Sequence, residues 1–298
     1  MVHLSPNCFL SAHAFPVTAL GALPEWAPLW ARRVLLVAMD RIALDATCVP
    51  SLNALRATLG LPPVRSVMRR WLHSPDLTVG AFPAWFAAPQ SDWPPATVVT
   101  GFPRLRVRAD PTLLEAVQEF LAAGPPPVVV TAGTAMAQGH AFFARALQAV
   151  AALGQRALFV TRFADQLPER LPDSVRVAAH LPFDVLLPQV AVLVHHGGIG
   201  TTAAALAAGI PQLVIPFAFD QFDNAARVVR LGVGRSCPTL DAAAWTAGLG
   251  ALLAPDDARR DALRRCQTLL AEAPDASVQI AEHLENLVSA SSSKSQSP

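Results

Sequence analysis

From Pro127 onwards, short apolar runs alternate with longer stretches in which apolar residues recur at helical spacing. The apolar runs lie at Val128–Ala132, Ala157–Thr161, Val175–Ala179, Val190–Val194 and Gln212–Phe217, and helical stretches at Ala141–Leu153, Thr201–Ala208 and Asn224–Leu231 separate several of them. Continuously apolar strands are buried on both faces, and strands that alternate with helices form parallel sheets. The pattern therefore predicts an α/β domain with a doubly wound parallel sheet.

The first 103 residues lack this alternation and are rich in Pro and Trp. Further helices are predicted near Leu29–Ala46, Val49–Leu59, Pro111–Ala123, Ala242–Leu253, Asp256–Glu272 and Ala276–Val288. Between the two regions lies a charged, extended stretch. We predict a partial N-terminal domain over residues 1–103, a linker over 104–111, a C-terminal domain over 112–288 and a disordered polar tail over 289–298.

Composition narrows the class of protein. The 298 residues are ample for a buried core, and 52% of them are apolar. A net charge of +1 gives no basic footprint for nucleic acid, so no nucleic-acid partner is expected. The four cysteines lie far apart and indicate free thiols rather than a zinc site or disulfides. Since neither a secretory signal nor a membrane span is evident, we expect a cytoplasmic location.

The most informative segment runs from His195 to Asn224. A strand, a Gly-rich turn and a helix follow one another, which places free backbone amides and a positive helix end against an anion. The turn consists of His196, Gly197, Gly198, Gly200 and Thr201. No Lys precedes the threonine, so the turn is not a P-loop. The alternative interpretation is that the glycines only permit a tight crossing from strand to helix.

Asp220 and Gln221 follow the next apolar strand and should lie at the same carboxyl edge of the sheet. A carboxylate beside an amide can accept and donate across adjacent hydroxyls. Asp220 could also cap the helix that follows, and the two roles are compatible. A phosphate site beside two hydroxyl-binding side chains suits a nucleotide-sugar.

These residues resemble the donor-binding signature of nucleotide-sugar-dependent glycosyltransferases of GT-B fold. They are most similar to the bacterial macrolide, rhamnosyl and flavonoid relatives of the plant UDP-glycosyltransferases. The similarity extends upstream through His180–Phe183 and downstream through Leu231–Gly234, and more weakly to Thr100–Pro103. It implies an α/β fold of GT-B type, with a complete C-terminal Rossmann-like domain and a partial N-terminal one. The Gly-rich first strand, loop and helix of the family's N-terminal domain have no counterpart in this chain, which we expect to be N-terminally truncated.

The resemblance assigns roles to individual residues. His196 would hydrogen-bond the donor diphosphate and stabilise the leaving group, while Asp220 and Gln221 would bind the hydroxyls of the sugar. Gly133 and Thr134 follow the first strand of the C-terminal domain, where relatives carry a Gly-Ser pair that contacts the phosphates; a plain turn is the alternative.

For the nucleotide base, His180 falls where many relatives stack an aromatic ring, and Leu181 would offer backbone groups to the edge of the base. The alternative for His180 is a surface residue at a strand end. Ala204 replaces the glutamate that binds the ribose in the plant signature, which makes a dTDP-sugar as reasonable a donor as a UDP-sugar.

The resemblance implies a glycosyltransferase that moves a hexose-type sugar from a UDP- or dTDP-sugar to an acceptor hydroxyl, with inversion and without a metal. The nucleotide-sugar is a co-substrate, no further cofactor is expected, and the acceptor would be a small or lipid-like molecule. The family's catalytic base lies in the part not found here, so no general base is assigned in this chain. Two alternatives remain open: a non-catalytic remnant that binds nucleotide-sugars, and a subunit completed by a second polypeptide that supplies the N-terminal part.

Overall fold

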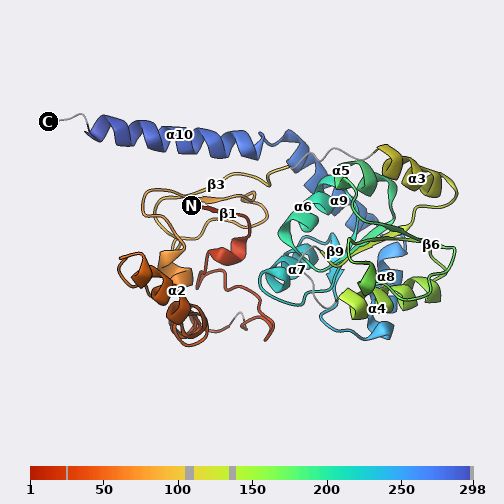
Figure 1. Ribbon diagram of the computed structural model, residues 1–298, viewed down its shortest axis with the longest axis horizontal. Helices are drawn as coiled ribbons and strands as arrows, with labels where there is room; N and C mark the ends of the chain where they lie inside the picture. Colours follow the sequence, from red (N-terminus) through yellow and green to blue (C-terminus); the bar gives the residue numbers. More distant parts are fainter. Residues whose placement is uncertain (25, 105–110, 134–138, 296–298) are drawn as a thin grey trace. The chain divides into compact units, whose positions relative to one another are not determined.

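The computed structural model describes residues 1–24, 26–104, 111–133 and 139–295 (Figure 1). Residue contacts divide the chain into two compact units, Met1–Arg104 with Ala273–Pro298, and Leu105–Glu272. The predicted C-terminal domain ran to residue 288, whereas residues 273–288 group with the first unit. Apart from its end residues, the predicted linker at 104–111 lies outside the described residues.

The second unit is built on a parallel sheet of six strands in the order β6-β5-β4-β7-β8-β9. The strands are β4 Val128–Thr131, β5 Ala157–Val160, β6 Val175–Ala178, β7 Val192–His195, β8 Gln212–Val214 and β9 Gly234–Ser236. The chain moves outward from β4 to β6 and then returns to place β7 beside β4. The predicted doubly wound sheet is thus confirmed, and its topological switch point lies between β4 and β7.

Helices cover both faces of this sheet. The helices are α3 Pro111–Ala122, α4 Gly139–Ala152, α5 Phe183–Leu186, α6 Ile199–Ala208, α7 Gln221–Arg230, α8 Ala242–Leu253 and α9 Asp257–Glu272. Figure 1 shows α4 and α8 on one face and α3, α5 and α6 on the other. Along β4, Val128 and Val130 pack towards α4 and α8, while Val129 packs towards α3 and α6. This alternation is the reason that the strands read as continuously apolar.

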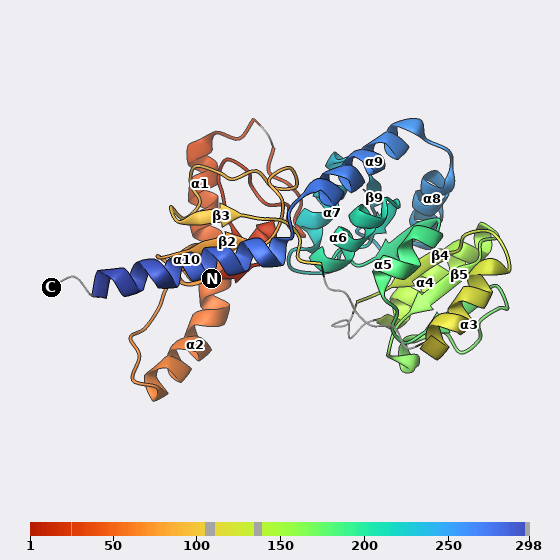
Figure 2. The ribbon, with the colours of Figure 1, turned by 90° about the horizontal axis from the view of Figure 1, so that it is seen from above.

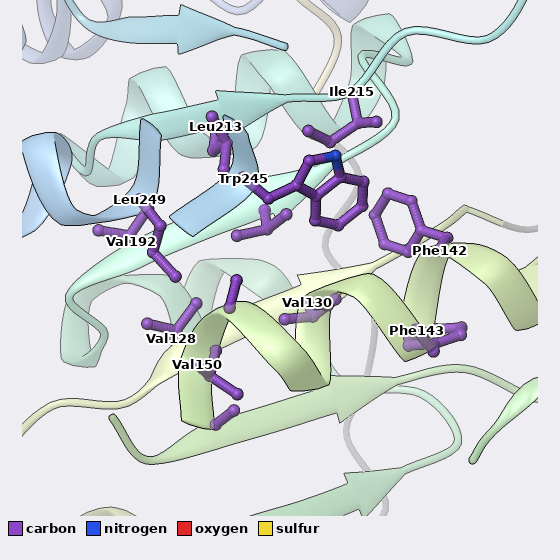
Figure 3. Packing of buried hydrophobic residues seen from close by; sticks show 14 of the residues in the cluster. Val128, Val130, Phe142, Phe143, Val150, Val192, Leu213, Ile215, Trp245 and Leu249 are labelled. Carbon is purple, nitrogen blue, oxygen red and sulfur yellow. The ribbon is translucent and has the colours of Figure 1, made fainter. Parts of the chain in front are cut away.

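Trp245 on α8 is the largest fully buried side chain of the unit. Its ring lies beside Ile215 and Phe142 (Figure 3), with 5.1 Å between the centroids of the Phe142 and Trp245 rings. Its Nε1 donates to the carbonyl of Thr239 at 2.6 Å, so the one polar atom of the ring is satisfied. Trp245 therefore packs α8 against the sheet at Leu213 and Ile215.

The first unit contains a small parallel sheet of three strands in the order β1-β2-β3. Its elements are β1 Val2–His3, β2 Thr78–Gly80, β3 Thr97–Val99, α1 Leu29–Ala38, a π-helical segment Met39–Asp45, α2 Ala46–Thr58, a π-helical turn Val67–Trp71 and α10 Ala276–Ser295. Figure 2 shows these strands and helices from a second direction. α10 continues to Ser295, whereas the sequence predicted a disordered tail from residue 289. Among the residues described, no helix has both the length and the apolar character needed to cross a membrane.

Candidate functional site

The predicted phosphate-binding turn connects β7 to α6 at the switch point of the sheet. Gly197 has a φ of +94°, and a Cβ there would lie 2.8 Å from Cγ1 of Val214 and 3.1 Å from the carbonyl oxygen of Gln221. The position therefore requires glycine for both conformation and space. Gly198 is the N-cap of α6, and no side chain within the described residues caps this helix. The first amides of α6, which include those of Gly200 and Thr201, are thus free of a side-chain cap. Such free amides are the groups with which a helix N-terminus can bind an anion.

His195 holds this turn from within the core. It is fully buried, its Nε2 lies 3.0 Å from Oε1 of Gln212, and its Nδ1 accepts the amide hydrogen of Gly197 at 3.1 Å. Since Nδ1 accepts, the hydrogen is on Nε2, which donates to Gln212. Burial, with a smaller contribution from the neighbouring His196, lowers the pKa of His195 to about 3, although the bond to Gln212 opposes the shift. His195 is therefore a neutral structural residue at physiological pH.

The ring of His196 does not share the orientation of the His195 ring: the planes of the two imidazoles are 90° apart. This difference agrees with the alternation of side chains along a strand. The ring of His196 lies against Gly133, which follows β4: a Cβ at Gly133 would be 2.5 Å from Cε1 of His196, and one at Gly198 would be 2.4 Å from Nε2. Burial lowers the pKa of His196, and the charge of Asp220 partly offsets this effect. Its Nδ1 is buried and has no hydrogen-bond partner in the described part of the chain. The ring thus sits between the ends of the two switch-point strands.

Asp220 is tied to the same turn through a residue whose bridging role the sequence did not reveal. The buried Asn224 donates from Nδ2 to the carbonyl of Gly197 and to Oδ2 of Asp220, both at 2.9 Å. Asp220 occupies the N-cap position of α7, but its side chain makes no capping bond. Its carboxylate is therefore fixed beside the phosphate-binding turn and is not used to cap the helix.

The side-chain oxygen of Gln221 has a structural role. This atom, Oε1, accepts the amide hydrogens of Phe217 and Ala218, at 2.8 and 3.1 Å. These bonds close the loop that leads to Asp220, in which the highly exposed Phe219 has a φ of +55°. With the oxygen engaged, only the Nε2 group of Gln221 is left to donate to a ligand.

His180 and Leu181 lie elsewhere along the carboxyl edge. His180 is exposed, and Leu181 is buried in the core on the α3 and α6 side of the sheet. Both follow β6, which is three strand positions from β7, or about 14 Å in a regular sheet. The structure does not bring His180 or Leu181 into contact with the phosphate-binding turn. Thr134 lies outside the described residues.

His195→Asn should flatten the pH dependence of the free energy of unfolding. Below pH 6.5 the histidine of the unfolded chain takes up a proton, whereas the folded one stays neutral to about pH 3. The unfolded state then binds more protons than the folded state. The free energy of unfolding therefore decreases as the pH is lowered, by up to about 1.4 kcal/mol per pH unit for this residue. Asparagine retains an acceptor near the position of Nδ1 but does not titrate. Urea denaturation from pH 7 to pH 4.5 measures the slope.

Ser174→Asn, at an exposed position of the same unit, is the control for the substitution itself and should leave the slope as in the wild type. Parallel curves for the wild type and His195→Asn would contradict the assignment of a buried neutral imidazole.

Comparison with known proteins points to one class. Residues 145–287 match the family described as "Erythromycin biosynthesis protein CIII-like, C-terminal domain". Glycosyltransferase GtfC of Amycolatopsis orientalis is 34% identical over 223 residues, which are 70% of this chain and 51% of that protein. The structure of the glycotransferase of kitacinnamycin matches with a TM-score of 0.63 and 21% identity over 87% of this chain and 66% of that one. Spinosyn rhamnosyltransferase SpnG, complexed with thymidine diphosphate, matches with a TM-score of 0.59 and 26% identity over 72% and 58%.

These matches define the class of protein. The fold is the α/β fold of GT-B glycosyltransferases, and residues 145–287 resemble the EryCIII-like C-terminal domain. The resemblance drawn from the His195–Asn224 segment is thereby confirmed. The chain spans about half the length of curated relatives such as GtfC.

Proposed function

We propose that this chain is part of a glycosyltransferase that moves a hexose-type sugar from a dTDP- or UDP-sugar to an acceptor hydroxyl. One observation carries the proposal: the ring of His196 lies at the switch point, beside the start of α6 that no side chain caps, and the negative charge of Asp220 acts on this ring. Diphosphate and sugar are the two chemical groups that such a pair of neighbouring positions suits. Relatives named as glycosyltransferases, and a relative complexed with thymidine diphosphate, support it.

In the proposed reaction the acceptor oxygen attacks the anomeric carbon with inversion. The bond from that carbon to the diphosphate oxygen breaks, and its electron pair leaves with the diphosphate. The amides of α6 and the ring of His196 stabilise this charge, in the role that a metal ion takes in other enzymes. Asp220 and Nε2 of Gln221 orient the sugar through its hydroxyls. The acceptor proton passes to a base that we do not assign to this chain.

A second candidate is a protein that binds the nucleotide-sugar without turnover. The observation in its favour is that the residues proposed to contact the donor, from Gly133 to Gln221, all lie in one unit, Leu105–Glu272. The two candidates share the donor site and differ in turnover. Release of dTDP from a dTDP-sugar in the presence of candidate acceptors, followed by chromatography, distinguishes them.

Asp220→Ala should lower the affinity for dTDP-glucose by about tenfold, because a charge-assisted hydrogen bond to the sugar is lost. Its affinity for dTDP alone should remain as in the wild type, since the carboxylate is proposed to contact only the sugar. Titration calorimetry of the whole chain with dTDP, UDP and their glucose conjugates measures both affinities.

The exposed Asp173 offers the matched control, and Asp173→Ala should bind all four ligands normally. If Asp220→Ala loses affinity equally for dTDP and dTDP-glucose, Asp220 does not contact the sugar. No heat with any of the four ligands, from a folded wild-type sample, would refute both candidate functions.

A further inference from the structure

A cavity with a volume of about 810 Å³ lies within the first unit. Its lining comes from residues between Leu10 and Ala96, so it is separate from the turn at His196. Arg33 of α1 lines it together with Arg69 and Arg70 of the π-helical turn. Three exposed arginines from two elements therefore line one hollow.

The lining residues include three arginines and one aspartate, so the cavity carries a net positive charge. In the described residues, no carboxylate lies within ion-pair distance of these three guanidinium groups. Asp92 is the one acid among the lining residues, and its two oxygens accept from the hydroxyl of Ser11 at 2.6 Å and the amide of Ala12 at 2.8 Å. Both carboxylate oxygens of Asp92 are thus held by the segment that contains Ser11 and Ala12.

The three arginines are not equivalent. Arg69 also acts electrostatically on the buried Asp40, whose pKa is raised by burial and lowered in part by this arginine. Among the described residues, the side chains of Arg33 and Arg70 make no hydrogen bond or ion pair. These two are accordingly the residues best placed to hold an external anion.

The rest of the lining is mainly apolar and includes the unsatisfied indole donor of Trp93. Leu36, Val37 and Pro95 face the cavity together with the indole of Trp93. Nε1 of Trp93 is buried and has no hydrogen-bond partner among the described residues, and an indole nitrogen can only donate. Burial lowers the pKa of the lining residue His73, so the cationic character of the cavity comes from the arginines and persists above neutral pH.

From this lining we infer that the cavity binds an organic anion in which a carboxylate is attached to an apolar body of one or two rings. A guanidinium group presents paired donors that match the two oxygens of a carboxylate. The apolar body would displace water from Leu36, Pro95 and the face of Trp93. The carboxylate is the group that Arg33 and Arg70 select.

The test compares two probes of the same shape, 2-naphthoate and 2-naphthylmethanol, by titration calorimetry of the whole chain at pH 7.5. We expect the acid to bind at least about tenfold more tightly than the alcohol. In Arg33→Gln/Arg70→Gln this preference should disappear, while the affinity for the alcohol stays unchanged. Raising the salt concentration should weaken only the acid, because charge pairing is screened.

Arg41→Gln is the matched control, since Arg41 is exposed on the same unit and does not line the cavity. It should retain the preference for the acid. Equal affinities for acid and alcohol in the wild type would overturn the inference, as would a preference that survives in the double variant. Circular dichroism verifies the folding of each variant. Binding of dTDP, measured on the same samples, reports on the other site, so failure here is distinguishable from failure of the proposed function.

Discussion

Gly197→Ala should lower the affinity for dTDP by about 100-fold. An L residue at a φ of +94° costs about 1–3 kcal/mol, and the new methyl group would lie 2.8 Å from Val214 and 3.1 Å from the carbonyl oxygen of Gln221. The backbone has to move to relieve these contacts. That movement would break the bonds that hold the Gly197 peptide, one to His195 and one from Asn224. The amides of α6 would then no longer be aimed at the phosphates.

Gly154→Ala separates conformational strain from the site. Gly154 lies in the same unit and also has a positive φ, of +60°, but nothing lies within 4 Å of a Cβ there. This variant should lose about 1 kcal/mol of stability and keep its affinity for dTDP. Titration calorimetry measures the affinities and urea denaturation the stabilities. A Gly197→Ala variant that binds dTDP as the wild type does would show that the turn is not the phosphate site.

Most strands and helices of the second unit can be predicted from the sequence, because each leaves a local pattern of apolar residues. The apolar runs that became β4 to β8 reflect burial on both faces of the sheet, and the predicted range Ala242–Leu253 coincides with α8. The edge strand β9 was missed, because Gly234–Ser236 contains no apolar residue and its pairing with β8 depends on the assembled sheet. The strands of the first unit have only two or three residues each, too few for any periodicity.

In the candidate site too, local features could be predicted from the sequence, whereas contacts between distant residues could not. The turn at His196 and the position of Asp220 follow from the order of strand, turn and helix, which is a local property. The bridges made by Asn224 and Gln212 join residues 27 and 17 positions apart, and they depend on the register between β7 and β8. A signal for Gln212 was present, since it is a polar residue at the start of an otherwise apolar strand. Its partner could not be identified without the register.

Trp245→Ala should destabilise the second unit by about 3–5 kcal/mol, the range observed when large buried aromatic residues are truncated. Trp245 is 1% exposed and is packed against Phe142, Leu213 and Ile215. Truncation would open a cavity between α8 and the sheet, and it would leave the carbonyl of Thr239 without its donor. Urea denaturation followed by circular dichroism measures the change.

Trp30→Ala is the matched control, because Trp30 is 70% exposed and its removal should cost less than about 1 kcal/mol. A loss of that size for Trp245→Ala as well would contradict the packing described.

The destabilised variant also tests whether donor binding and folding of the second unit are coupled. Trp245 packs in the same core cluster as Leu213 of β8, and the chain continues from β8 to Asp220. In the described part of the chain, the hydrogen bond and the ring contact of the indole go to Thr239 and Phe142, which are not proposed ligand residues. The folded variant should therefore bind dTDP with nearly the affinity of the wild type. A ligand that binds only the folded state adds about 2.7 kcal/mol of stability at 100 times its Kd, so dTDP should offset much of the loss. If saturating dTDP leaves the urea midpoint of Trp245→Ala unchanged, the nucleotide does not bind the folded second unit.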